Sequence, residues 1–90
     1  MDGQQQRRAL TAATSALRAL AAGQAARAVH AAGKAAALDQ LGMYAGFAEW
    51  VGRAAAEVEE FGRVLPTTRQ ALRDSLGPGP LTAAVEEWLA

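Results

Sequence analysis

The sequence predicts an all-α protein: a small antiparallel bundle of three longer helices with one or two short C-terminal helices. About a quarter of the 90 residues are Ala, the strongest helix former, and β-branched residues are few. Apolar residues recur at intervals of three and four along most of the chain, which is the period of one helix face. A chain of this length has room for a single hydrophobic core.

Two helices are expected in the first part of the chain, separated by Gly23. Leu10, Leu17 and Leu20 lie on one face of a helix over residues 5–22. Beyond Gly23 the apolar positions shift by roughly 110° around the helix axis, which a straight helix does not accommodate. A helix end at Gly23 removes the conflict, because Gly readily adopts the left-handed cap conformation. One long helix bent at this Gly is the alternative.

The strongest periodic pattern predicts a helix over residues 43–65. Its apolar face is spaced regularly over more than six turns and comprises Met43, Phe47, Trp50, Ala54, Val58, Phe61 and Leu65. The opposite side carries Glu49, Arg53 and Glu57 at successive spacings of four, where opposite charges attract weakly. Pro66 is expected to end this helix.

A shorter helix should follow Pro66. Thr67 or Thr68 is suited to cap its N-terminus, because a hydroxyl oxygen accepts hydrogen bonds from unpaired backbone N–H groups. Leu72 and Leu76 supply its apolar face. The Gly that follows, at position 77, stands where a C-terminal cap belongs.

The chain divides into residues 1–76 as a helical bundle, 77–80 as a Gly-Pro linker, and 81–90 as a short amphipathic helix. Thr82 is the expected N-cap of this tail helix. A helix of ten residues is not stable alone in water, so the tail must dock on a surface. It either closes the protein's own core or binds a partner in the helix-in-groove manner, through Leu81, Val85, Trp88 and Leu89.

The helix over residues 43–65 is expected to pack in the groove between the first two. The core should then centre on the largest apolar side chains of the three helices: Leu17, Leu20, Val29, Phe47, Trp50, Val58, Phe61 and Leu65.

Composition argues against several classes of function. The chain has no Cys and one His, which leaves no cysteine zinc site and no polyhistidine metal site. No catalytic constellation or cofactor motif is found, and we expect a non-enzymatic protein without cofactor or metal. A formal net charge of zero disfavours nucleic acid as a partner. Charged residues interrupt every long apolar stretch, so no membrane span is expected. A cytoplasmic location is expected, with secretion without a cleaved signal left open.

A polar patch is expected on the second helix, where Arg27, His30 and Lys34 lie opposite the apolar face. A lone His followed closely by Lys and Gly resembles the motif of histidine phosphotransfer domains. Here Gly33 precedes Lys34, so the two residues stand in exchanged order. The resemblance implies a phosphorelay protein using His30; the alternative is a solvated surface His.

Residues 21–39 resemble the turn and second helix of a tetratricopeptide repeat. Gly23 falls at the turn, and Ala28 and Ala35 fall at the small packing positions of that family. The first helix lacks the family's large Leu-Gly and aromatic positions. Because a single repeat builds no solenoid, the resemblance implies only a helical hairpin used in protein binding.

Trp50-Val51-Gly52 resembles the motif of the small Trp-x-Gly helical-hairpin proteins exported by type VII secretion. In that family the motif forms the turn between two long helices, so the resemblance implies a turn at residues 48–54. The apolar stripe runs through Trp50, and Pro66 interrupts the expected second helix. Both features depart from the family's pattern.

These observations together predict a helical protein–protein interaction module, such as an adaptor, chaperone-like or assembly protein. Its expected partner is another helical protein or a second copy of itself. A secreted Trp-x-Gly protein and a phosphorelay protein remain the alternative classes.

Overall fold

The computed structural model describes residues 3–89 and is all-helical over that range, as the sequence predicts. Its five helices are α1 (Gly3–Ala21), α2 (Ala25–Leu38), α3 (Ala45–Phe61), α4 (Pro66–Leu76) and α5 (Pro80–Trp88). Among these helices none is long and apolar enough to cross a lipid bilayer.

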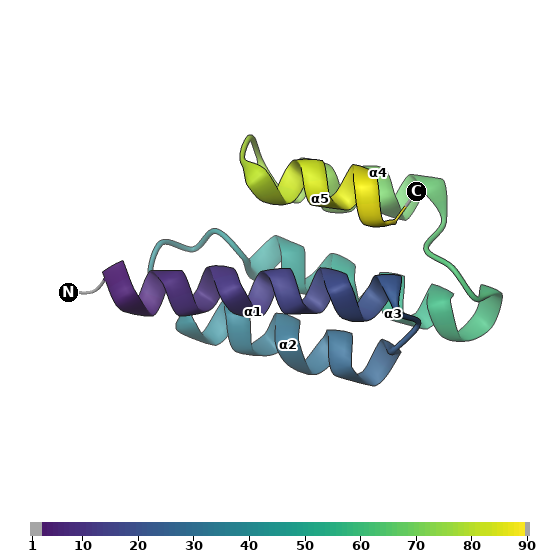
Figure 1. Ribbon diagram of the computed structural model, residues 1–90, viewed down its shortest axis with the longest axis horizontal. Coiled ribbons are helices and arrows are strands. Elements are labelled where there is room, and N and C mark those ends of the chain that lie inside the picture. Colours follow the sequence, from purple (N-terminus) through teal and green to yellow (C-terminus); the bar gives the residue numbers. More distant parts are fainter. Residues whose placement is uncertain (1–2, 90) are drawn as a thin grey trace.

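The helices form two layers in a molecule 41 Å long (Figure 1). In one layer α1 and α2 form an antiparallel hairpin, and α3 packs chiefly on α2 while also contacting α1. The other layer is a second hairpin, in which α4 packs on α3 and α5 packs on both α1 and α4. The C-terminal helix therefore docks on its own chain.

The break between α1 and α2 confirms that the first part of the chain is two helices. Gly23 has a φ of 75°, in the left-handed region that favours glycine. Its N–H donates to the Leu20 carbonyl at 3.1 Å, and the Gln24 N–H donates to the Ala19 carbonyl at 2.8 Å. These two bonds satisfy carbonyls that the end of α1 leaves without helical partners.

The helix predicted over residues 43–65 is shorter at both ends, Ala45–Phe61. Gly62 ends it with a φ of 78° and donates its N–H to the Val58 carbonyl. The prediction extended to residue 65 because the apolar spacing continues past this glycine. A left-handed Gly cap stops the helix one turn before Pro66.

The expected caps of α4 and α5 are wrong at their N-termini. Glu57 from α3 accepts the Leu65 N–H at 3.0 Å and the Thr68 hydroxyl at 2.6 Å, so a neighbouring helix supplies the group expected from Thr67 or Thr68. Thr82 lies inside α5 and donates its hydroxyl to the Gly77 carbonyl.

The boundaries of the linker also differ from the expectation. Pro80 occupies the first turn of α5, where its missing N–H costs nothing, so the linker covers 77–79. Gly77 ends α4 with a φ of 67°, as predicted.

Four of the eight expected core residues are buried: Leu17, Leu20, Phe47 and Val58. Trp50 and Leu65 are half-buried. The expectation is wrong for Val29 and Phe61, which are 48% and 53% exposed.

The two exposed core candidates have separate physical causes. The buried face of α2 consists of Ala alone and includes Ala28 and Ala32, so the helices approach closely and Val29 points away from the contact. Phe61 is the last residue of α3, directly before the Gly62 cap where the helix ends. Val51, Leu72 and Val85 were not among these eight residues and are fully buried.

Candidate functional site

The tail residues predicted to bind a partner are placed by the structure mostly in the chain's own core. Leu81, Val85 and Leu89 are 8%, 0% and 8% exposed. Trp88 is half-buried, and the Arg18 guanidinium lies 4.9 Å from the centre of its ring. A cation over an indole face is favourable, so this contact helps to fix α5 on α1.

Polar contacts hold the other side of α5 to α4. The Arg69 guanidinium donates to the Leu89 carbonyl at 3.1 Å, where the helix ends. Arg73 and Glu86 form an ion pair at 2.6 Å on the surface. The apolar face of α5 is therefore covered within one chain.

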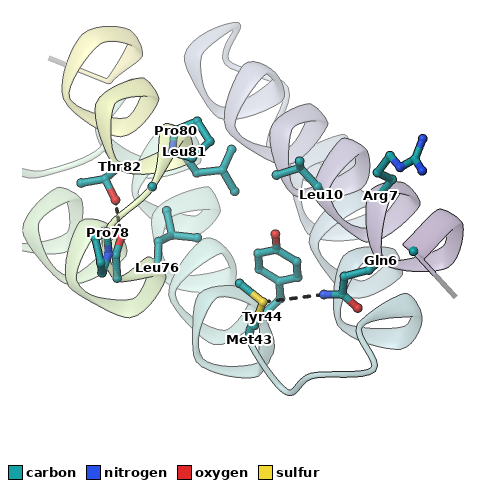
Figure 2. Close-up of a pocket in the computed structure, with 13 residues that line it drawn as sticks. Gln6, Arg7, Leu10, Met43, Tyr44, Leu76, Pro78, Pro80, Leu81 and Thr82 are labelled. Atoms are coloured by element: carbon teal, nitrogen blue, oxygen red, sulfur yellow. Dashed lines mark hydrogen bonds between the residues drawn. The ribbon is translucent and has the colours of Figure 1, made fainter. Parts of the chain in front are cut away.

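An apolar groove lies at the end of the molecule where the two layers meet (Figure 2). Its volume is about 370 Å³, near the lower end of the range for ligand sites. Its walls come from the first half of α1, the loop before α3, the end of α4, the linker and the start of α5. The larger lining side chains are Gln6, Arg7, Leu10, Met43, Tyr44, Leu76, Pro78, Pro80 and Leu81.

Large apolar side chains of this groove reach the solvent. Leu10 is 36% exposed and Met43 is 47% exposed, although both belong to the apolar stripes of their helical patterns. Leu41, in the same loop as Met43, is 72% exposed. Exposed apolar side chains gathered around a hollow are typical of a binding surface.

Tyr44 supplies a hydrogen-bond donor inside the groove. Its ring packs edge-on against Phe47, 6.0 Å between centroids, and the residue is only 4% exposed. Its hydroxyl points into the space between Leu10 and Leu81 (Figure 2), where within residues 3–89 it has no protein hydrogen-bond partner and stays open to water. Burial, together with the negative charge of Asp39, raises the pKa of Tyr44, so the hydroxyl stays protonated. The Tyr44 hydroxyl can therefore donate a hydrogen bond to a ligand bound in the groove.

Asp39 holds the loop that carries Met43 and Tyr44. Its carboxylate accepts the Tyr44 N–H at 2.7 Å, the Leu41 N–H at 3.0 Å and the Gln6 side-chain amide at 2.8 Å. Partial burial acts to raise the pKa of Asp39, but these hydrogen bonds outweigh it and hold the pKa below its ordinary value. Asp39, which does not line the groove, thus holds in place the loop that contributes Met43 and Tyr44 to it.

The expected patch on α2 is only partly brought together. His30 and Lys34 line a shallow hollow of about 340 Å³ between α1 and α2, but Arg27 does not. Arg8 and Ser15 of α1 line the same hollow. Sequence reasoning missed these two residues, because their position depends on the register between two helices and leaves no local signal.

The structure also shows where the Trp-x-Gly motif and the residues that resemble a tetratricopeptide repeat lie. Residues 48–54 lie inside α3, so the turn implied by the Trp-x-Gly resemblance does not form there. Ala28 and Ala35 are fully buried in the α1–α2 hairpin, with Gly23 at the turn. Many helical hairpins share this arrangement, so it identifies no family.

Comparisons with models of known protein families, with curated proteins and with solved structures each returned no match for this chain. Within residues 3–89 no three His, Asp or Glu side chains gather as a metal site would require. The case for function therefore rests on the surfaces of the molecule.

Proposed function

We propose that this chain is a non-enzymatic protein–protein interaction module that binds an apolar segment of a partner protein in the groove between α1 and α5. The observation that carries the proposal is the Tyr44 hydroxyl, a donor on a 4% exposed residue, directed into an open apolar hollow. The hydroxyl is open to water in the unbound protein, and a bound segment would replace that water with a backbone carbonyl as the hydrogen-bond acceptor.

A protein segment fits the surface better than a small compact ligand. Met43 lines the groove and is 47% exposed, and Leu41 in the same loop, which does not line the groove, is 72% exposed. A ligand confined to about 370 Å³ would leave that surface in water, whereas a helix or extended peptide would cover it.

The charges around the groove indicate the chemistry of the segment. The lining includes Arg7 and no acidic residue, and Figure 2 shows the Arg7 guanidinium directed outward at the edge of the groove. The segment should therefore carry two or three large apolar side chains for the groove and an Asp or Glu for Arg7. Such a rim charge mainly sets orientation and the rate of association.

The test uses peptides selected from a random displayed library against the full chain, with Met43→Asp as the disrupting variant. Val29→Asp is the matched control, because Val29 is 48% exposed, lies on α2 and does not line the groove. Placing a carboxylate in the apolar contact should raise the Kd of the selected peptides at least about tenfold, while the control leaves it unchanged.

Two outcomes would overturn the proposal. Selected peptides that bind the Met43 variant and the control equally would place the binding surface elsewhere. Light scattering that shows a dimer of the wild-type chain, lost in Met43→Asp alone, would make a second copy the occupant instead of a separate partner.

A further inference from the structure

We propose that the hollow between α1 and α2 is a binding site for a phosphate group, held by Arg8, His30 and Lys34. This site is separate from the apolar groove, shares no lining residue with it and does not depend on the function proposed there. The inference rests on the convergence of cationic side chains from two helices on one hollow.

One face of each helix supplies the site. On α1, Arg8, Thr11 and Ser15 follow spacings of three and four, so they project from the same side. On α2, His30 and Lys34 are separated by four residues and also share a face. The antiparallel hairpin turns these two faces toward one hollow of about 340 Å³.

Small residues form the floor of this hollow. Ala12 and Ala31 are 6% and 8% exposed and lie between the longer polar side chains. Because their methyl side chains fill little space, the hollow stays open at Ala12 and Ala31, and the longer polar side chains line its sides. A compact anion can therefore approach the hairpin and contact both helices.

The charges of the lining favour an anion. Arg8 and Lys34 carry full positive charges, whereas no Asp or Glu lines the hollow. Within residues 3–89 the ion pairs are Arg53 with Glu57 and Arg73 with Glu86, neither of which involves these cations. A bound anion would be attracted to Arg8 and Lys34 at the same time.

The donors match a tetrahedral oxyanion in particular. The Arg8 guanidinium is a planar fork of N–H donors suited to two phosphate oxygens, and the Lys34 ammonium acts as a point charge on a third. The Ser15 hydroxyl adds a neutral donor. The Thr11 hydroxyl already donates its hydrogen to the Arg7 carbonyl at 3.0 Å, so Thr11 lines the hollow but does not donate a hydrogen bond to the anion.

The experiment is an NMR titration of the full chain with inorganic phosphate at constant ionic strength, following backbone amide shifts. Arg8→Gln and Lys34→Gln each remove one lining charge from an exposed position. Arg63→Gln is the matched control, because Arg63 is also exposed and lies near Gly23, at the opposite end of α1. Circular dichroism melts verify that all three variants remain folded.

We expect saturable shifts centred on the lining residues of α1 and α2, with the Kd raised about tenfold by Arg8→Gln or Lys34→Gln and unchanged by Arg63→Gln. A parallel titration with phenyl phosphate distinguishes the source of the group. Tighter binding of the ester would indicate a phosphorylated organic ligand, and equal binding would indicate free phosphate. Linear, unsaturated shifts, or equal weakening by the Arg63 variant, would overturn the proposal.

Discussion

Replacing Val85 with Ala tests whether α5 belongs to the core of this protein. Val85 is fully buried where α5 meets the rest of the chain. Val29 provides a matched control, because it is also a helical Val but is 48% exposed. Both substitutions change helix propensity by the same amount, so the difference between them reports packing.

The expected magnitude follows from the atoms removed at Val85. Each buried methyl group contributes about 0.8 kcal/mol through transfer from water, and two are lost. The cavity left behind adds about 0.5–1 kcal/mol, and the better helix propensity of Ala offsets about 0.5 kcal/mol. The free energy of unfolding should therefore fall by about 2 kcal/mol for Val85→Ala and change by less than about 0.5 kcal/mol for Val29→Ala.

Urea unfolding followed by circular dichroism measures both values. With an m-value of about 1 kcal/mol/M, which is typical of small domains, the midpoint for Val85→Ala should fall by about 2 M. Equal midpoints for the two variants would refute the packing argument and would indicate that α5 is a free docking peptide, not part of the core.

Three further predictions concern polar contacts. Folding lowers the pKa of Asp39 below its ordinary value of 3.8, so its contribution to stability is present above that value and is lost as pH falls through the folded pKa. Asp39→Asn should therefore weaken the loss of stability in acid, measured by urea melts between neutral pH and about pH 2. Glu57→Gln should lower the free energy of unfolding by about 1–2 kcal/mol by weakening the cap of α4, whereas Glu60→Gln on the same helix should leave it unchanged. Arg18→Gln should cost about 0.5–1 kcal/mol and shift the fluorescence of Trp88 to the red, and an unaltered spectrum would contradict the stacking.

Local signals account for the parts of the fold that the sequence predicted. The ends of α1 and α4 were found because Gly23 and Gly77 adopt positive φ angles that other residues disfavour. The N-terminal cap of α4 was missed because its acceptor, Glu57, lies on another helix. No spacing rule links a carboxylate to a backbone N–H eight residues away across a turn.

The groove was also out of reach of sequence reasoning. Leu10 and Met43 were assigned to buried apolar stripes, and periodicity does not show that the second layer stops short of them. Tyr44 lay next to the predicted start of a helix and carried no pattern of its own. Its role depends on the loop that Asp39 holds in place, which is a tertiary arrangement.

Intermolecular NOEs between a selected peptide and the methyl-labelled full chain test the central claim most directly. The account predicts contacts from the peptide's apolar side chains to the methyl groups of Leu10, Met43 and Leu81, together with contacts to the Tyr44 ring. NOEs confined to Trp88 and the exposed side of α5 would contradict it and place recognition on the C-terminal helix.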